Sequence, residues 1–469
     1  MRKRLELNQK SMKKRIWRTL TLPCVLLFLL LLAFQIKCSS FVTFNWAPRK
    51  TTPVTETERD MIEFELNTST QGTALMKEMA PPPRQITCDR SHYAYDICTI
   101  HVETTLNPTT STFFIQHPTT VDPNQTATKI RPYPRKFDGP VMSRIKELTI
   151  TAGTPTPSCH VKHEDPALVF SAGGYTGNFF HDFNDGFIPL FITLNSFFHD
   201  KDAVLVISKA RDWWVNKYAT LLREFSKHPI VDLDNDNKTH CFPDATLGLV
   251  SHGFMTIKPE LMRNPKSLHD FHAFLRKTYG ANDNNVSSSS FPRPRLVLLN
   301  RSGGDGRLLL NMEEVKLEMQ RVGFNVIVFE PTATTPLSKA FEVVGSSHAM
   351  VGIHGAALTH SLFLKPGCVL IQVVPLGLES VAEMCFGKVG EMGLKYMEYR
   401  VRVEESSLVE KYDREDVMIK KQSDFVNGRA WNESTMNVYL KEQNLRLDLV
   451  RFRKYLKKAY NNAKQLIGS

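Results

Sequence analysis

A histidine and several small residues follow directly after an apolar run in the second half of the chain. The run is residues 349–353 (AMVGI), and the loop and helix start that come next contain the candidate ligand residues His354, Gly355, Ala356, Ala357 and Thr359. Small residues let the backbone approach a phosphate closely, and the N–H groups and dipole of a helix start favour negative charge. His354 can add a hydrogen bond or a positive charge. This segment therefore suggests a phosphate-binding loop.

A glycine-rich loop with two arginines follows a second apolar run. Residues 295–300 (RLVLLN) lead into residues 300–307 (NRSGGDGR), which contain Arg301 and Arg307. The planar fork of a guanidinium group matches two diphosphate oxygens. Glu330, at the end of a third apolar run, is placed to accept a hydrogen bond from a ribose hydroxyl or a base. A single loop of this kind is most often only a turn, but three loops after successive runs favour an anionic nucleotide as the ligand.

The first half has an imidazole and a carboxylate at helical spacing. In residues 173–185 (GGYTGNFFHDFND), His181 and Asp185 are four residues apart, so they share one face of a helix that Asn178 precedes. Such a pair in a cleft could act as a general base. The alternative is structural, with a helix cap and a buried His–Asp hydrogen bond, and the residues alone leave both open. The stretch has neither a GxGxxG nor a GK[ST] pattern, which excludes a dinucleotide fingerprint and a Walker loop.

Three aspartates, Asp232, Asp234 and Asp236, look at first like a metal cluster. A calcium loop of the EF-hand type also needs Gly at its sixth position and Glu at its twelfth. This chain has Asn237 and Pro243 at those positions, and it has no CxxC pair of the kind that zinc ribbons use. We therefore expect a solvated acidic turn here.

The elements that position these residues alternate between apolar strands and amphipathic helices. The alternation occurs in residues 166–233 and again in residues 295–374, with the polar segment 282–294 (NDNNVSSSSFPRP) between them. This pattern is typical of parallel sheets with covered faces. We therefore expect an α/β fold in which two Rossmann-like domains face a cleft, with ligands at the carboxyl ends of the strands. Within the second domain, a helix at 312–322 should be capped by Asn311 together with Glu314.

The positive charge of the chain is concentrated at its N-terminus. Residues 1–18 hold eight basic residues and one acid, so they carry seven of the eleven net positive charges. Residues 19–36 (TLTLPCVLLFLLLLAFQI) have no charge, and eighteen helical residues rise about 27 Å, enough to cross a bilayer. The pattern predicts a cytosolic basic tail, a transmembrane signal anchor and a lumenal body. A cleaved signal peptide is the alternative, although its apolar region is usually shorter. The small charge on the body gives nucleic-acid binding little support.

The lumenal body divides into a stem and two domains. Residues 37–85 are rich in Thr, Pro and charge, so we expect an extended stem. An N-terminal domain should follow at 86–285 and a C-terminal domain at 286–469. The charged helical tail of the second domain, at about 436–465, could pack back across the first half.

Lumenal location makes disulfides and glycans expected. Cys88 and Cys98 are close in sequence and are expected to pair, but six lumenal cysteines allow fifteen connectivities and the sequence does not choose among them. Asn300 carries a glycosylation motif at the end of an apolar run, where a glycan would hardly fit. The candidate glycosylation sites are therefore Asn67, Asn124, Asn237, Asn285 and Asn432.

Three stretches together resemble the plant members of glycosyltransferase family 61. They are residues 173–191 (GGYTGNFFHDFNDGFIPLF), 300–311 (NRSGGDGRLLLN) and 351–375 (VGIHGAALTHSLFLKPGCVLIQVVP), and the resemblance spans roughly residues 86–460. It implies an inverting, metal-independent transferase of the two-Rossmann GT-B type, anchored in the Golgi membrane as a type II protein and using a UDP-sugar. The plant clade that the chain most resembles adds β-1,2-xylose or α-1,3-arabinofuranose to xylan.

The resemblance also implies roles for particular residues. The loop from His354 to Ala357 would hold the donor diphosphate in the C-terminal, nucleotide-sugar domain, with Arg301 and Arg307 neutralising its charge. Asn178, His181 and Asp185 would lie on the acceptor side, in the N-terminal domain. Asp185, through or instead of His181, would remove the proton from the acceptor hydroxyl. The loop at 300–307 has fewer arginines than expected for the family, which leaves open which arginine makes the main phosphate contact.

The expected function is therefore transfer of a pentose from a UDP-sugar to the xylan backbone. The sequence does not distinguish UDP-xylose from UDP-arabinofuranose. Two other functions remain open: a xylosyl- or N-acetylglucosaminyl-type transferase acting on N-glycans or glycoproteins, and a non-catalytic lumenal scaffold that binds UDP. The expected partners are the sugar donor, a xylan or xylo-oligosaccharide acceptor, the Golgi membrane and other glycosyltransferases in a complex.

Overall fold

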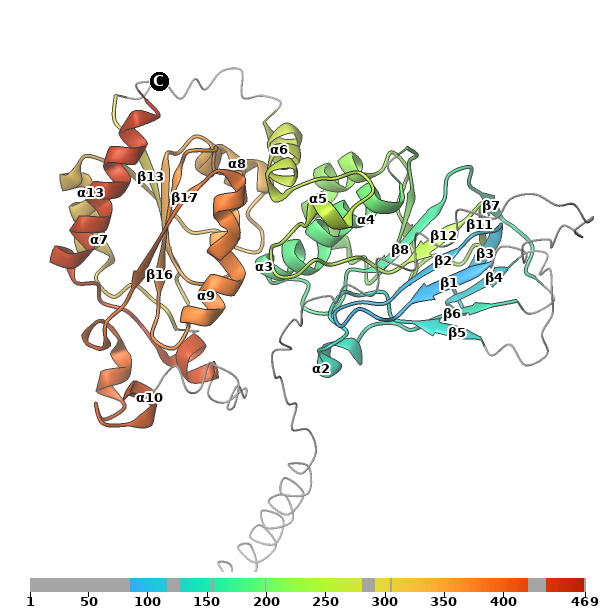
Figure 1. Ribbon diagram of the computed structural model, residues 1–469, viewed down its shortest axis with the longest axis horizontal. Coiled ribbons are helices and arrows are strands. Elements are labelled where there is room, and N and C mark those ends of the chain that lie inside the picture. The colour runs from blue at the N-terminus through green and yellow to red at the C-terminus, as the bar shows by residue number, and fades with distance from the viewer. Residues whose placement is uncertain are drawn as a thin grey trace, which may run out of the picture. The chain divides into compact units, whose positions relative to one another are not determined.

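A computed structural model describes most of the region after the expected stem (Figure 1). The described residues are 85–115, 127–152, 156–198, 200–280, 292–303, 306–420 and 436–467. All of them belong to the unit Pro82–Ser469. The expected basic tail, membrane anchor and nearly all of the stem lie outside the described residues, as do the candidate glycosylation sites Asn67, Asn124, Asn285 and Asn432. None of the helices in the described part combines the length and apolar content needed to cross a membrane.

The first half contains two six-stranded sheets. One has the order β1-β2-β12-β8-β9-β10, in which β12, β8, β9 and β10 run parallel while β1 and β2 are antiparallel to their neighbours. Its strands are β1 Ile86–Asp89, β2 Ile97–Ile100, β8 Ala167–Ser171, β9 Val204–Ser208, β10 Val231–Asp232 and β12 Ala245–Leu247. The other sheet has the order β5-β6-β4-β3-β11-β7. Its strands are β3 Thr104–Asn107, β4 Thr112–Ile115, β5 Thr128–Ile130, β6 Leu148–Thr151, β7 Val161–Lys162 and β11 His240–Phe242.

Alternating side chains of β8 face different partners. Leu168 and Phe170 pack in the core with the helices, whereas Ala167 and Val169 pack in a separate core with residues of the second sheet such as Phe113. The helices of this half are α2 Gly139–Met142, α3 Phe179–His181, the π-helical η2 Asp182–Phe187, α4 Ile188–Phe197, α5 Asp212–Phe225, the 3₁₀ turn η3 Pro259–Leu261 and α6 Leu268–Tyr279. The Rossmann-like expectation therefore needs correction for the first half. Its parallel strands are buried on both faces, as expected, but one covering layer is a sheet.

The second half has a single parallel sheet with the order β14-β13-β15-β16-β17. Its strands are β13 Arg295–Leu299, β14 Asn325–Phe329, β15 Ala349–Ile353, β16 Val369–Val374 and β17 Lys395–Arg400. Its helices are α7 Met312–Val322, α8 Leu337–Gly345, the 3₁₀ helix η6 Ala356–Phe363, α9 Glu379–Phe386, η7 Gly387–Met392, η8 Val403–Glu405, η9 Ser407–Glu410, α10 Val417–Lys420, η10 Val438–Glu442 and α13 Leu449–Gln465. Strand order reverses between β13 and β15, and in sheets of this order the ligand binds at such a reversal.

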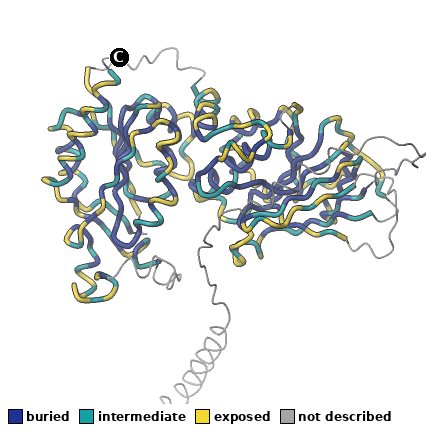
Figure 2. The backbone as a smooth tube through the Cα atoms, in the orientation of Figure 1, coloured by how far each residue is buried: buried dark blue, intermediate teal, exposed yellow. Residues whose placement is uncertain are grey.

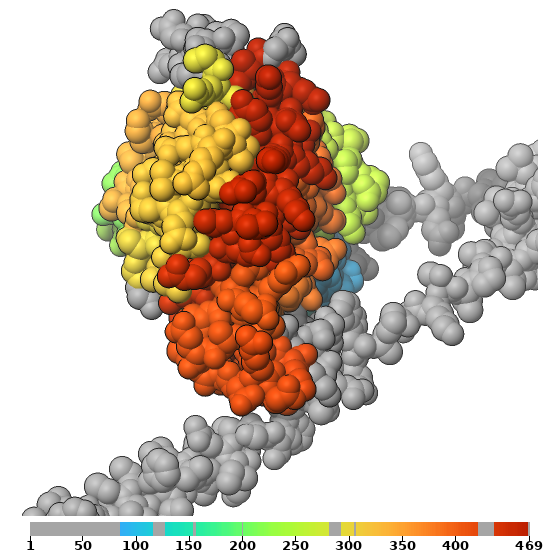
Figure 3. All heavy atoms as spheres, turned by 90° about the vertical axis from the view of Figure 1, so that its left-hand side faces the viewer, coloured from blue at the N-terminus to red at the C-terminus, as the bar shows by residue number. Residues whose placement is uncertain are grey.

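Two local expectations for the second half are wrong. Asn311 does not cap α7 through its side chain; its amide exchanges two 3.0 Å hydrogen bonds with the backbone of Leu447. The C-terminal helix does not fold back across the first half. It packs on α7 and on the sheet of its own half, where Phe452 and Leu456 are fully buried. Figure 3 shows α13 in red lying along the yellow segment that contains α7. The pairing of α13 with α7 is non-local, so the sequence pattern did not reveal it.

The two halves share one apolar core. Buried side chains from β8 and β9 of the first half belong to the same cluster as Leu370 of β16 and Phe386 of α9. Figure 2 shows buried backbone, in dark blue, along the central strands of each half. Phe180 of α3 packs edge-on against Phe386, with ring centres 5.7 Å apart. The elements expected to carry the site therefore meet across a packed contact.

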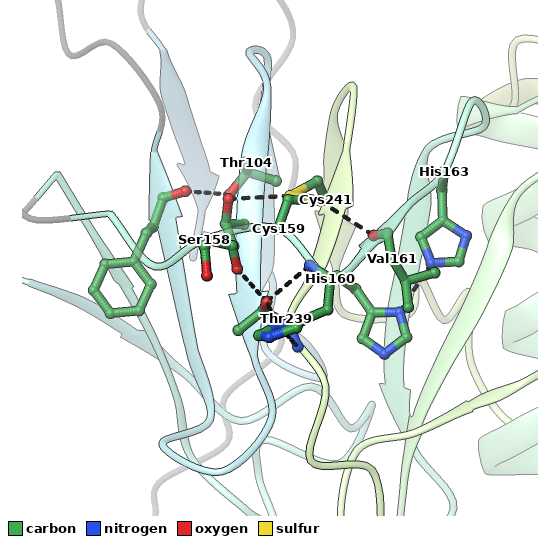
Figure 4. The surroundings of a disulfide bond; sticks show 11 residues. Thr104, Ser158, Cys159, His160, Val161, His163, Thr239 and Cys241 are labelled. Carbon is green, nitrogen blue, oxygen red and sulfur yellow. Dashed lines mark hydrogen bonds between the residues drawn. A yellow bond between two sulfur atoms is a disulfide. The ribbon is translucent and has the colours of Figure 1, made fainter.

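The described residues contain two disulfides. Cys88 and Cys98 are directly paired across β1 and β2, which confirms the predicted bond. Cys159 pairs with Cys241 beside β11, where the His160 N–H donates to the carbonyl oxygen of Thr239 over 3.1 Å (Figure 4). Cys368 and Cys385 are buried free thiols. Burial raises the pKa of Cys368 to about 11 and that of Cys385 to about 12, so both thiols stay protonated at neutral pH.

Peptide mapping under non-reducing conditions should recover the two disulfides Cys88–Cys98 and Cys159–Cys241. Iodoacetamide should label Cys368 and Cys385 only after denaturation, because thiolate formation and access are both suppressed by burial. Mass spectrometry of native and denatured samples measures this. Rapid labelling of either thiol in the native protein, or a disulfide that includes one of them, would contradict the described core.

Candidate functional site

A pocket of about 420 Å³ lies at the carboxyl ends of β13, β14 and β15, where strand order reverses. The loops that the sequence singled out in the second half all reach it. Predicted residues that line it are Arg301, Arg307, Glu330, His354, Gly355, Ala356 and Ala357. The first half adds Gly177, Phe179 and Lys217. The three strand-end loops therefore form one concave site, as the pattern predicted.

The charge in the pocket suits a polyanion. Among the described residues that line it, Lys217, Arg301 and Arg307 are cationic and Glu330 is the one carboxylate. Glu330 is already engaged with its own loop: it accepts hydrogen bonds from the Asn300 amide over 2.8 Å and from the backbone N–H and hydroxyl of Ser302. The hydrogen bond from the Ser302 hydroxyl is the main cause that lowers the pKa of Glu330. Glu330 therefore holds the arginine loop in place as a carboxylate.

Gly355 gives the two arginines room to lie over the backbone. A Cβ at this position would lie 3.1 Å from Nη1 of Arg307 and 3.9 Å from Nη1 of Arg301. Arg307 Nη1 donates a 3.0 Å hydrogen bond to the carbonyl oxygen of His354. The absence of a side chain at Gly355 thus brings both guanidinium groups to the same end of the pocket, where a diphosphate could bind both.

His354 is a neutral hydrogen-bond donor. Burial, and then the charge of Arg307, lowers its pKa to about 3, which decides between the two roles expected for it. The Gln372 amide lies 2.8 Å from Nδ1 of His354, and an amide N–H donates to a ring nitrogen that carries no proton. The proton therefore sits on Nε2. The Tyr396 hydroxyl lies 2.6 Å from the oxygen of the same amide and 2.9 Å from a carboxylate oxygen of Glu398.

Gln372 and Tyr396 were missed from the sequence. Gln372 is a fully buried amide in the otherwise apolar strand β16. A polar residue in the middle of a buried strand needs a partner, so this position was a signal that could have been read. Tyr396 gave no comparable signal because its contact with Gln372 depends on the pairing of β16 with β17.

Of the residues predicted after His354 to bind the ligand, all but one line the pocket. Ala356 and Ala357 begin the 3₁₀ helix η6 and line the pocket. Thr359 is fully buried and is not among the residues that line the pocket, so the structure does not bring it together with the other predicted site residues.

The first half contributes a lysine and an aromatic stack that the sequence did not reveal. Phe179 stacks on His360 of η6 with ring centres 4.2 Å apart. Lys217 lies 5.3 Å above the Phe179 ring and donates a 3.1 Å hydrogen bond to the carbonyl oxygen of Ala333. In the sequence Lys217 looked like any lysine on an amphipathic helix. Its position on α5 brings a cation from the first half to the pocket.

The carboxylate of Asp185 is buried and accepts hydrogen bonds from four side chains. It is 2% exposed and accepts hydrogen bonds from His181 Nδ1 at 2.8 Å, Tyr133 at 3.0 Å, Arg135 at 3.2 Å and Asn184 at 2.6 Å. Burial alone would raise the pKa of Asp185, but the hydrogen bond and charge of His181 and the charge of Arg135 outweigh it and hold that pKa low. Asp185 therefore stays ionised, and it has no surface on which to meet a substrate.

His181 is the member of the pair that reaches solvent. Its side chain is 19% exposed, and donation from Nδ1 to Asp185 leaves Nε2 without a partner among the described residues. Asn178 caps α3 by accepting the Phe180 N–H over 3.1 Å. The structural alternative, a cap and a buried His–Asp hydrogen bond, is thus confirmed. The same geometry orients His181 with a free basic nitrogen, so the catalytic reading stays a prediction for His181.

The glycines of the first motif serve this network. Gly174 has φ +64°, and a Cβ there would lie 2.5–2.7 Å from the ring and hydroxyl of Tyr133. A side chain at this position would displace Tyr133 from Asp185. A glycine at position 174 is therefore needed so that the hydroxyl of Tyr133 can reach the carboxylate of Asp185.

Asn178, His181 and Asp185 do not line the pocket themselves. Gly177 and Phe179, on the same turn of chain as His181, do. Behind them, Phe180 packs against Phe386, whose ring centre is 5.9 Å from that of His354. A layer of aromatic side chains thus separates His181 from His354, and the two sites adjoin along the start of α3.

The acidic turn is arranged as expected from its sequence. Asp232 accepts the backbone N–H of Asp234, Asp234 pairs with Lys146 at 3.0 Å, and Asp236 pairs with His240 at 3.0 Å. Among the residues that the structure describes, no three His, Cys, Asp or Glu side chains gather as a metal ion would require. Asn237, in the same turn, is exposed.

Comparison with known proteins identifies the family of the chain. A model of the family described as glycosyltransferase 61 matches residues 177–371, which include the pocket loops and His181. The chain is 37% identical over 397 residues to a xylan glycosyltransferase, MUCI21, of Arabidopsis thaliana, an alignment that covers 80% of this chain and 79% of that protein. It is 35% identical over 410 residues to a beta-1,2-xylosyltransferase, XYXT1, of Oryza sativa subsp. japonica, covering 81% and 85%.

A third relative is named as an arabinosyltransferase. The chain is 34% identical over 380 residues to an alpha-1,3-arabinosyltransferase, XAT3, of Oryza sativa subsp. japonica. The alignment covers 80% of this chain and 65% of the rice protein, so the chain spans slightly less than two thirds of that relative.

Replacing Arg307 with Ala should weaken binding of a nucleoside diphosphate by about tenfold to a hundredfold, because a charge-assisted hydrogen-bond donor at the diphosphate is removed. Calorimetry with UDP measures the loss. Arg414→Ala, which removes an exposed arginine outside the pocket, is the matched control and should bind as the wild type does. Equal affinity of the Arg307 variant would exclude this arginine from the diphosphate site.

Affinity for UDP-xylose should be nearly constant between pH 5 and pH 8. His354, whose pKa is about 3, stays neutral across that range, and the diester phosphates of a sugar nucleotide keep their charge. A cationic His354 with an ordinary pKa near 6.5 would instead give tighter binding as pH falls. Titration calorimetry across the range separates the two. Affinity that rises steeply below pH 6.5 would contradict a neutral His354.

Proposed function

Because the chain belongs to the glycosyltransferase 61 family, we propose that it is a pentosyltransferase that moves xylose or arabinofuranose from a UDP-sugar to the xylan backbone. Its similarity to plant xylosyl- and arabinosyltransferases over about four fifths of the chain supports this function. The observation that carries the proposal is the pocket at the strand reversal, with Arg301, Arg307 and neutral His354 at one end. The linkage is β-1,2 for xylose or α-1,3 for arabinofuranose.

In this proposal the second half holds the donor. Arg301 and Arg307 bind diphosphate oxygens, and Nε2–H of His354 donates to one of them. Negative charge grows on the phosphate oxygen as the bond to the anomeric carbon breaks, and preorganised donors stabilise it. The cationic side chains supply the charge that a metal ion would otherwise provide. Glu330, the carboxylate among the described pocket residues, is engaged with Asn300 and Ser302 and is poorly available as a metal ligand.

His181 is the proposed general base, and Asp185 is the residue that positions it. The acceptor hydroxyl loses its proton to Nε2 of His181 as its oxygen attacks the anomeric carbon, and UDP leaves from the opposite side. One C–O bond forms and one breaks. Because the attack comes from the side opposite the leaving UDP, the anomeric configuration inverts. Asp185 keeps the proton of His181 on Nδ1 and stabilises the imidazolium that forms. This assigns the base to His181 rather than to Asp185, because Asp185 is closed to the substrate.

We further propose that the two halves form a GT-B-type enzyme in the Golgi lumen, held as a type II protein by residues 19–36. The basic tail followed by an uncharged stretch supports this topology. The two disulfides support an oxidising compartment. Exposed Asn237 is a suitable glycosylation site. Association with other xylan-synthesising transferases is part of the same proposal.

The test uses the full chain from a secretory host, incubated with xylo-oligosaccharides and a panel of UDP-sugars, with product linkage read by NMR. His181→Ala should lower kcat by about 10²–10⁴-fold while UDP affinity stays unchanged. Asp185→Asn should lower kcat and alter its pH profile. His228→Ala removes the histidine of another His–Asp pair, His228–Asp165, and should be close to wild type in activity.

Each alternative has its own outcome. An active His181→Ala enzyme would reject His181 as the base, and a product of retained configuration would reject direct displacement. UDP binding without consumption of any UDP-sugar would favour a non-catalytic scaffold.

A further inference from the structure

Exposed aromatic side chains gather beside His181. Among the residues that the structure describes, five aromatic side chains are substantially exposed, and three of them are Tyr93 at 65%, Phe137 at 50% and Tyr175 at 37%. They come from distant parts of the chain: the loop between β1 and β2, the turn before α2, and the turn between β8 and α3. Exposed aromatic surface gathered in one place is a common sign of a binding site.

The three rings form a row that ends at His181. The rings of Tyr93 and Phe137 are stacked at an angle of 29°, with centres 6.0 Å apart. The guanidinium of Arg135 lies 5.1 Å from the ring centre of Phe137 and equally far from that of Tyr175. Tyr175 then stacks on the His181 imidazole at 4.5 Å and 28°. We call Tyr93, Phe137 and Tyr175 the aromatic row.

Polar contacts hold the backbone under the aromatic row. Lys136 donates its backbone N–H to Ala94 over 2.8 Å and its ammonium group to the Arg90 carbonyl over 2.7 Å, and it pairs with Asp96 at 2.7 Å. These contacts fix the β1–β2 loop, which carries Tyr93, to the turn that carries Phe137. In Figure 1 that loop lies beside α2. Hydrogen bonds and ion pairs therefore set the position of the row, and Tyr93 and Phe137 remain at least half exposed.

The network that holds Asp185 also supports the row. Arg135 pairs with Asp185 at 3.2 Å and with Asp138 at 3.6 Å, and the Tyr175 hydroxyl donates to Asp138 over 3.1 Å. The charge of Arg135 is thus balanced by carboxylates below the rings. A row of flat apolar faces over a balanced charge suits an uncharged polymer with apolar C–H faces better than a polyanion.

We propose that the aromatic row binds the acceptor polysaccharide, with successive residues of a β-linked pyranose chain packed against the exposed parts of Tyr93, Phe137 and Tyr175. The C–H face of a pyranose packs on an aromatic ring, and its equatorial hydroxyls stay in water. Because Tyr175 stacks on His181, a hydroxyl of the sugar residue bound at Tyr175 then lies at Nε2 of His181. This inference rests on the proposed function of His181, and it adds the direction in which the acceptor lies.

The test measures binding and turnover separately with the full chain. Calorimetry uses xylohexaose, xylobiose, cellohexaose and anionic lipid vesicles, and transfer assays give KM for the acceptor, KM for the donor and kcat. Loss of each ring in Tyr93→Ala and Phe137→Ala should weaken xylohexaose binding by about three- to tenfold, with little change for xylobiose. Acceptor KM should rise, while kcat and donor KM stay unchanged. Tyr93→Phe and Phe137→Tyr should restore the affinity.

The control is Phe197→Ala, which removes a ring of equal exposure to Tyr175 on another surface. Unfolding temperatures of all variants should match the wild type because the rings removed are exposed. Unchanged xylohexaose affinity in a variant that combines Tyr93→Ala with Phe137→Ala, or ring-dependent binding to vesicles alone, would overturn the proposal. Ring-dependent binding of cellohexaose instead of xylohexaose would support the row as a polysaccharide site and contradict the xylan function. Ring-dependent binding of xylohexaose without transfer would support the row and contradict only the enzymatic function.

Discussion

The proposed acceptor side of this protein depends on how one buried carboxylate is neutralised. A buried ionised carboxylate is costly unless charge and hydrogen bonds surround it, and Asp185 has Arg135, Tyr133, Asn184 and His181 as partners. Each partner is thereby fixed in place. The imidazole is held with Nε2 toward solvent, and Arg135 is held beneath the rings of Phe137 and Tyr175. The proposed base and the proposed acceptor surface are thus held by the same network.

The proposed donor side depends on a different constraint, the reversal of strand order between β13 and β15. The reversal opens a gap at the carboxyl ends of the strands, and the arginine loop and Gly355 meet there. Buried hydrogen bonds then define the chemistry: Gln372 fixes the proton of His354 on Nε2, and Glu330 anchors the loop that carries Arg301. Phe179 and Lys217 bring the first half to this pocket, which is how the two sides of the proposed reaction come to adjoin.

The sequence predicted those features that local patterns determine. The strands and helices of residues 295–374, the strand-end loops and the His181–Asp185 contact follow from periodicity and spacing, and they were found. β17 and α9, which follow that range, were not predicted. Contacts between distant segments were not predictable in this way. The second sheet of the first half, the packing of α13 on α7, and Gln372 with Tyr396 all depend on strand or helix pairing. The aromatic row joins residues 93, 137 and 175, and no pattern in the sequence connects them. The burial of Thr359 was not predictable either, because it is set by tertiary packing.

The central claim is that a neutral His354 and two arginines hold the diphosphate while His181 receives the proton of an acceptor lying on the aromatic row. A structure of the full chain with UDP and xylohexaose bound tests it most directly. The account predicts diphosphate oxygens within hydrogen-bond distance of Arg307 and of Nε2 of His354, with one xylose hydroxyl at Nε2 of His181. A diphosphate bound elsewhere, or an acceptor chain remote from His181, would contradict it.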